Sequence, residues 1–443
     1  MIGDIKIIGL ALLLSIAVLI AASRYLKLNP FFSLLIAALI FGTIIGKPIL
    51  ETMTTMQAGF GLLLQQIGFL VAIGSCLGIV MERTGAMASI GTKIVNAFGK
   101  NKTLIAMSMI GVVVGIPVYC DSGFIILSRL IPALSSPKIN QAQLSLALSS
   151  GLYTSHTLVP PTPGPLAAAA NLGMSANLGL VILVGFIGAL PAALVAFWLS
   201  KKLGAKIHVA ETSHAAVQEI KHNSIISFLP LVLPILLISC ATLPNVIPGL
   251  QSLTSFFSIV GNPAVALFIG LLCSFLLISK KHKQEWPSWI SEALKDAGII
   301  LLITGAGGSF GAVIKSSGID LILKEQIAGS QSGGIIFLLI AFLLGSVLKT
   351  AQGSSTSAII VTSSLLAPLT VLAGFTSAIS LATLILAIGG GAMTVSHAND
   401  SYFWVVSQFS GISERDAYKS YTLITLAQGI TVLITSILLF ILL

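Results

Sequence analysis

Four short segments place ionisable or hydroxyl-bearing side chains beside residues that interrupt helices, within stretches that are otherwise apolar. These segments are 117–123, 155–165, 349–357 and 394–401. An ionisable side chain inside hydrocarbon is costly, and by default it indicates an ion, proton or substrate site. The candidates for a proton-coupling role are Asp121, His156, His397 and Asp400. Because they are far apart in the sequence, the fold must bring them together if they act in one site.

The ionisable residues of the first two segments each have more than one interpretation. Asp121 is a proton or cation site, an ion-pair partner of Arg129, or a cap for a helix that begins near Gly123. His156 precedes a proline-rich stretch that cannot be helical. It is either a group that titrates near neutral pH or a packed structural histidine.

The third segment, 349–357, suits a carboxylate because it combines free main-chain amides, hydroxyl groups and a helix N-terminus near Ser355. Lys349 adds a positive charge, neutralises Asp121, or extends toward the membrane surface. The structural alternative is that these small polar residues only pack between helices. The candidate substrate-binding residues of the whole chain are Ser122, Thr157, Thr162, Asn171, Lys349, Gln352, Gly353, Ser354, Ser355, Thr356, Ser396 and Asn399.

In the fourth segment, His397 and Asp400 stand three residues apart after an apolar run. They form a proton relay or a hydroxyl-binding pair, or they belong to an ordinary loop at the membrane surface. Asn399 beside them and Asn171 in the first half of the chain are candidate partners for substrate hydroxyl groups.

The composition excludes a soluble protein. The 443 residues are 56% hydrophobic and 8% charged, whereas soluble proteins carry roughly a quarter charged residues. The net charge of +9 is typical of Lys and Arg in cytoplasmic loops, and we expect no nucleic-acid partner. Several apolar runs reach the ~18–20 residues that cross a bilayer as helix. We therefore expect an all-α polytopic membrane protein, with spans near 5–23, 30–46, 60–81, 103–119, 177–199, 225–247, 254–279, 290–314, 334–349 and 419–442.

Two halves of the chain resemble each other. Glycines 74, 78 and 85 recur at identical spacing 233 positions later as glycines 307, 311 and 318, and Asn29-Pro30 recurs as Asn262-Pro263. Repeats of this kind build many secondary transporters, often with inverted topology and broken helices or re-entrant hairpins. We expect a first transmembrane repeat at 1–200, a cytoplasmic linker at 201–223 and a second repeat at 224–443.

Sequence signatures for several other functions are absent. The chain contains no GxxxxGK[ST] phosphate loop, no HExxH and no CxxC. We therefore expect neither an enzyme nor a protein that holds a cofactor or a metal ion.

Four motifs occur in the same order as in a known transporter family. They are Tyr119-Cys-Asp-Ser-Gly-Phe124, His156-x-x-x-Pro-Pro-x-Pro-Gly-Pro165, Gly353-Ser-Ser-Thr356 and Ser396-His-x-Asn-Asp-x-x-Phe-Trp404. On these motifs the chain resembles the gluconate permease (gluconate:H⁺ symporter) family over nearly its whole length. The resemblance implies import of gluconate, related sugar acids or D-serine with protons across a bacterial inner membrane. It also implies inverted repeats with re-entrant hairpins around a central site.

We therefore expect a proton-coupled symporter for a small carboxylate, in contact with protons, substrate and the lipid bilayer. Residues 353–356 are expected to bind the carboxylate, and Asp121 to carry the proton. Thr162 and Ser122 depart from the family pattern, which has a second histidine and a β-branched apolar residue at these places. The departures leave D-serine or another small acid open as the substrate. Sodium coupling, a passive anion channel and a homodimer are further open alternatives.

Overall fold

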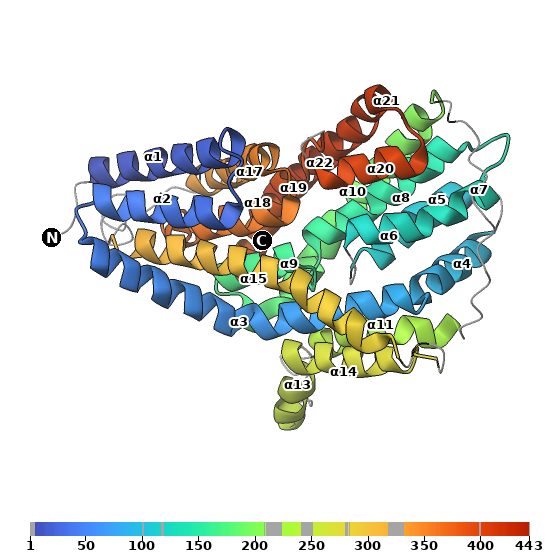
Figure 1. The fold of residues 1–443 in the computed structure, drawn as a ribbon, viewed down its shortest axis with the longest axis horizontal. Helices are drawn as coiled ribbons and strands as arrows, with labels where there is room; N and C mark the ends of the chain where they lie inside the picture. Colours follow the sequence, from blue (N-terminus) through green and yellow to red (C-terminus); the bar gives the residue numbers. More distant parts are fainter. Residues whose placement is uncertain are drawn as a thin grey trace.

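The computed structural model describes residues 5–99, 102–116, 119–207, 209, 224–240, 251–279, 282, 284–317, 332–397 and 400–442. These residues are almost entirely helical (Figure 1). The helices of the first half are α1 Ile5–Arg24, α2 Pro30–Ile44, α3 Ile49–Arg83, α4 Ala86–Phe98, α5 Thr103–Val114, α6 Cys120–Leu127, α7 Ile131–Leu134, α8 Gln141–Leu158, α9 Pro163–Asn171 and α10 Leu178–Gly204. Those that follow are α11 Ser224–Cys240, α13 Thr254–Val260, α14 Pro263–Phe275, α15 Trp286–Lys315, α17 Ser332–Gln352, α18 Ser355–Leu366, α19 Ala378–Met393, α20 Ser401–Ser410, α21 Glu414–Lys419 and α22 Tyr421–Leu442.

The predicted spans are only partly continuous helices. In the described part of the chain, five helical segments are long and apolar enough to cross a membrane, or six if the bent pair of α13 and α14 forms one span. Within the span predicted near 254–279, α13 and α14 meet at a bend of 56°. The prediction for 103–119 was too long, since α5 ends at Val114. Helix α3 in turn begins at Ile49, well before the expected residue 60.

Both Asn-Pro pairs begin a helix in the same way. The side chains of Asn29 and Asn262 each accept a hydrogen bond of 3.0 Å from the main-chain N–H two residues on. Pro30 and Pro263 occupy the first helical position, where a proline loses no hydrogen bond and its fixed φ suits the helix. The recurring Asn-Pro motif therefore marks the N-terminus of a helix in each half of the chain.

Close helix packing also recurs. Gly111 of α5 lies against the main chain of α8 at Leu148 and Gly151, and Gly345 of α17 lies against the main chain of α19 at Ile388 and Gly391. Small residues allow such close approach where lipid offers no hydrophobic driving force between helices. The division into repeats at 1–200 and 224–443, and their inverted orientation, stay predictions. Most of the expected linker lies outside the described residues, and 201–204 still belong to α10.

The two long helices α3 and α15 pack along each other near the middle of the molecule (Figure 1). A side chain at Gly59 of α3 would collide with the carbonyl group of Gly308 in α15, and a side chain at Gly308 would meet the carbonyl oxygen of Gly59. The main chains of α3 and α15 therefore approach each other here so closely that only glycine fits at both positions.

We predict that Gly59→Leu destabilises the protein by about 1–3 kcal/mol or more, because overpacking forces the two helices apart. The matched control is Gly61→Leu on the same helix, where a side chain meets nothing within 4 Å. Denaturant titration of the purified protein in detergent measures the difference. Equal free energies of unfolding for the two variants would contradict this account of the contact.

Candidate functional site

The structure interrupts the helical path at all four predicted segments. The breaks separate α5 from α6, α8 from α9, α17 from α18, and α19 from α20. Residues 117, 118, 398 and 399 in these breaks, and with them the candidate Asn399, lie outside the described part. Helix α6 begins at Cys120 rather than near Gly123. The prediction that the proline-rich stretch cannot be helical was wrong for its last three residues, because α9 begins at Pro163, where prolines in the first turn lose no helical hydrogen bond.

A cavity of about 200 Å³ lies where these breaks meet. Asp121 of α6, His156 of α8 and Asp400 before α20 line it together with the first turn of α18. Its remaining lining residues include three isoleucines of α15 and the rings of three tyrosines: Ile299, Ile300, Ile303, Tyr119, Tyr153 and Tyr402. The fold thus unites ionisable residues that are almost 280 positions apart in the sequence.

The N-terminus of α18 is built to present main-chain donors to the cavity. Gly353 adopts a left-handed φ of 73° between α17 and α18, a conformation that glycine adopts without steric cost. Ser354 caps α18 by accepting a 3.2 Å hydrogen bond from the N–H of Ser357. Residues 353–357 line the cavity, and Thr356 Oγ1 lies 3.4 Å from His156 Nε2. Free amides and the positive end of the helix dipole make such a terminus an anion site.

A buried ion pair joins the third and fourth breaks. Lys349 Nζ lies 2.5 Å from Asp400 Oδ2, and the two side chains are 1% and 5% exposed. Ser396 donates a 2.5 Å hydrogen bond to Asp400 Oδ2, and the main-chain N–H of Tyr402 donates to Oδ1 at 3.1 Å. Lys349 Nζ also lies 5.7 Å from the centre of the Tyr153 ring, within the range of a cation–π contact.

This pair decides between the alternatives for Lys349. The lysine neither extends to the membrane surface nor pairs with Asp121, because Asp400 is its charged partner in the described part of the chain. Asp400 is also 4% exposed as a residue, so the interpretation of 394–401 as an ordinary surface loop was wrong. The main-chain N–H of Asp400 donates a 2.7 Å hydrogen bond to the carbonyl oxygen of His397.

Asp121 stands at the boundary between two cavities. The interpretation of Asp121 as a helix cap was wrong, because Tyr119 is the N-cap residue of α6 and no side chain caps this helix. Asp121 Oδ1 is buried and has no hydrogen-bond partner among the described residues, while the Cys120 thiol lies 3.8 Å from Oδ2. The side chain of Arg129 lies outside the described part. An unsatisfied carboxylate oxygen at this depth is costly unless a proton or an ion joins it.

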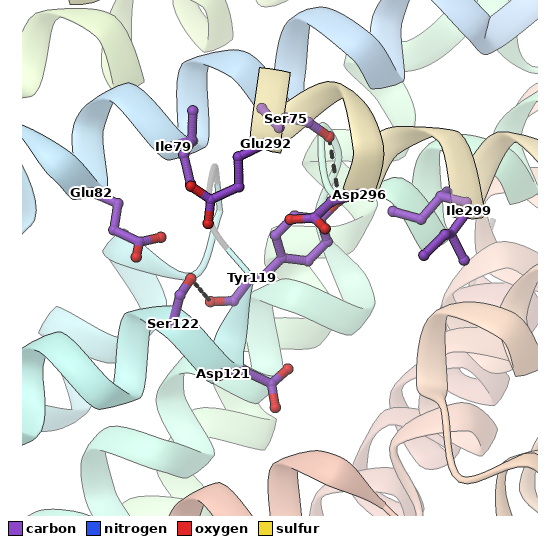
Figure 2. Close-up of a pocket in the computed structure, with 12 residues that line it drawn as sticks. Ser75, Ile79, Glu82, Tyr119, Asp121, Ser122, Glu292, Asp296 and Ile299 are labelled. Atoms are coloured by element: carbon purple, nitrogen blue, oxygen red, sulfur yellow. Dashed lines mark hydrogen bonds between the residues drawn. The ribbon is translucent and has the colours of Figure 1, made fainter. Parts of the chain in front are cut away.

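The second cavity, of about 350 Å³, carries several acidic side chains (Figure 2). Glu82 comes from α3, Glu292 and Asp296 come from α15, and Asp121 closes the inner side. At its rim Arg83 donates hydrogen bonds of 2.8 and 2.7 Å to the two carboxylate oxygens of Glu292. Ser122 also lines this cavity rather than the smaller one.

Sequence reasoning missed the acidic residues of α15 and the tyrosines of the smaller cavity. The carboxyl groups of Glu292 and Asp296 are four residues apart, so they share a helix face, but acidic residues near a helix end are also usual at a membrane surface. Tyr153 and Tyr402 lie 5.5 Å apart between ring centres, and in the sequence they look like core aromatic residues. Only their packing places them in the site.

Several predicted substrate-binding residues do not line either cavity. Thr157 and Thr162 donate hydrogen bonds to main-chain carbonyls one turn earlier. The Asn171 amide instead links α9 to α18 by donating to Ser363 and Ser364 at 2.8 and 3.0 Å. Further substrate-binding candidates outside the lining are Lys349, Gln352 and Ser396. His397, which was predicted for proton coupling, does not line either cavity.

Comparison with known proteins gives matches over the whole chain. The sequence model of the GntP permease family matches residues 6–442. An uncharacterized permease of Haemophilus influenzae is 34% identical over 437 residues, which cover 93% of this chain and 87% of that protein. A gluconate permease of Pseudomonas aeruginosa is 30% identical, with 93% and 92% covered. The inner membrane permease YgbN of Escherichia coli is 29% identical, with 91% and 92% covered.

Solved structures share the fold at low sequence identity. The YdaH transporter of Alcanivorax borkumensis matches with a TM-score of 0.66 and 15% identity, over 94% of this chain and 98% of that one. MtrF of Neisseria gonorrhoeae matches with a TM-score of 0.56 and 15% identity, over 95% and 96%. These matches confirm the predicted all-α fold of a polytopic membrane protein.

The buried ion pair generates a stability prediction. Lys349→Met leaves the Asp400 carboxylate buried without its counter-ion, which costs about 3–5 kcal/mol. Adding Asp400→Asn removes the uncompensated charge and restores most of this loss. Lys315→Met, at an exposed lysine, is the matched control. Free energies of unfolding measured in detergent check the series, and additive losses in the double variant would contradict the pairing.

Proposed function

The chain belongs to the GntP family of permeases, as its motifs predicted, and from this premise we propose that it carries gluconate or a related small sugar acid together with protons. It is a membrane transporter rather than an enzyme. The observation that carries the proposal is the 200 Å³ cavity, where the N-terminus of α18 faces the carboxyl groups of Asp121 and Asp400. An anion site beside buried acids is the arrangement that anion–proton symport requires.

The substrate carboxylate binds at the first turn of α18. Its oxygens accept hydrogen bonds from the main-chain amides that follow Ser354 and from the hydroxyl groups of Ser355 and Thr356. Ser357 and the His156 ring, which line the same cavity, offer partners for hydroxyl groups of a sugar acid. The apolar wall from α15 lies on another side of the cavity and excludes water.

Charge balance explains why a proton accompanies the anion. The described charged groups around the cavity are Lys349, Asp121 and Asp400, so one cation already faces two carboxyl groups. A further carboxylate adds like-charge repulsion in a confined, weakly polar space. Proton uptake removes this repulsion, and it also avoids about 2.3 kcal/mol for each charge moved across 100 mV.

Protons reach the site through the larger cavity. Its carboxyl groups raise the local concentration of cations, and Asp121 lines both this cavity and the smaller one. Asp121 therefore passes protons between them. By analogy with the inner membrane permease of Escherichia coli, the protein works in a bacterial inner membrane.

The test is accumulation of gluconate by proteoliposomes that contain the purified protein. An inward proton gradient should drive gluconate above its equilibrium level, because inward proton flow releases free energy that the carrier couples to the anion. A sodium gradient at equal pH should not drive it. Accumulation with sodium alone favours a sodium-coupled carrier, and equilibration without accumulation favours a channel. D-serine in place of gluconate tests the alternative substrate.

Asp121→Asn should reduce proton-driven accumulation to background, because the amide cannot pass a proton between the cavities. Exchange of internal for external gluconate at equal pH should persist, since the anion site is unchanged. Asp416→Asn, on the short helix α21 outside both cavities, is the matched control. Proton-driven accumulation in Asp121→Asn at the wild-type rate would remove Asp121 from the mechanism.

A further inference from the structure

We infer that the Lys349–Asp400 pair is the element that couples substrate to proton. The substrate carboxylate takes the place of Asp400 as the counter-ion of Lys349, and Asp400 takes up the proton. This inference rests on the proposed function. It identifies Asp400 as the acid that holds the proton while the substrate is bound. In this scheme Asp121 transfers the proton between the two cavities, and Asp400 binds it.

The placement of the two side chains is the first support. Asp400 lines the 200 Å³ cavity, whereas Lys349 does not, and Lys349 is the more deeply buried of the two. Asp400 thus contacts the lysine through its carboxylate and also borders the cavity. An anion that enters the cavity reaches the lysine when the Asp400 carboxylate moves aside.

The charges around the pair are the second support. Asp121 of α6 interacts electrostatically with both Lys349 and Asp400. The other titratable groups that face the pair come from α6, α8, α20 and α22: Cys120, Tyr153, Tyr402 and Tyr421, and His156 lines the same cavity. Among the described side chains, Lys349 is thus the strong cation in a largely acidic and phenolic surrounding. It cannot neutralise both Asp400 and a second carboxylate.

The exchange keeps the net charge of the site constant. The ion pair between Lys349 and Asp400 breaks, an ion pair between Lys349 and the substrate carboxylate forms, and one proton from the larger cavity joins the freed Asp400 carboxylate through Asp121. No other bond is made or broken. When the substrate leaves, Asp400 loses the proton and pairs with Lys349 again.

The surroundings of Asp400 suit both of its forms. Ser396 and the main-chain N–H of Tyr402 hydrogen-bond the charged carboxylate. The Ser396 hydroxyl also accepts a hydrogen bond from the protonated form after rotation about its side chain, because a hydroxyl is both donor and acceptor. Ser396 is thereby a positioning residue, which explains why it does not line the cavity itself.

The test measures protons taken up when potassium D-gluconate binds to the purified full-length protein in weakly buffered detergent solution with a pH indicator dye. The wild type should take up about one proton for each gluconate bound, and its binding constant should fall about tenfold for each unit of rising pH once Asp400 is ionised. Asp400→Asn should bind gluconate with no proton uptake and no pH dependence over this range. Asp400→Glu should restore both.

Asp121→Asn separates the two acids. Because Asp121 only passes the proton, this variant should take up about one proton at equilibrium while losing proton-driven transport. Asp416→Asn is the control for an aspartate outside the site. Proton uptake by Asp400→Asn equal to that of the wild type overturns the inference and leaves the symport proposal standing.

Other outcomes bear on the proposed function instead. Wild-type protein that binds no gluconate removes the proposed substrate, and wild-type binding without proton uptake removes proton coupling. If Asp400→Asn does not fold, the neutral double variant Lys349→Gln/Asp400→Asn replaces it. The affinity of that variant for gluconate should be at least tenfold lower, because a hydrogen bond from a cation to a buried carboxylate raises the affinity by more than tenfold. The variant should also take up no proton. Wild-type affinity with proton uptake in this variant also overturns the inference.

Discussion

A main-chain amide within the hydrocarbon of a bilayer has no water to bind, so a helix breaks there only where protein encloses the break. The other features of the site depend on this constraint. Helices α6 and α18 begin at the 200 Å³ cavity, and their first turns carry donors that the helix itself does not satisfy. The enclosing helices α8, α15 and α20 turn these exposed termini into a cavity that holds polar groups away from lipid.

Enclosure also sets the electrostatics. Lys349 and Asp400 are both almost fully buried, and a buried pair gains its stability only while both partners remain. The same property makes the pair sensitive to any anion that enters the cavity. In the proposed mechanism, the ion pair between two helix breaks is the group that responds to the substrate carboxylate.

Close packing of main chains positions the breaks. The contact at Gly59 and Gly308 brings α3 and α15 together, and these helices supply Glu82, Glu292 and Asp296 to the larger cavity. The Arg83–Glu292 pair joins the same two helices at the rim. The packing of α3 against α15 therefore positions the acidic side chains that line the larger cavity beside Asp121.

The sequence by itself determined the membrane class, the family and the places where helices break, because these depend on composition and on local residues such as Pro160 and Pro161 between α8 and α9. It did not determine that Lys349 pairs with Asp400 rather than Asp121, because that choice depends on how α17 and α20 pack. The roles of Tyr153, Glu292 and Asp296 were likewise decided by the tertiary structure. A side chain's chemistry is local, but its partner is set by contacts between residues that the sequence holds far apart.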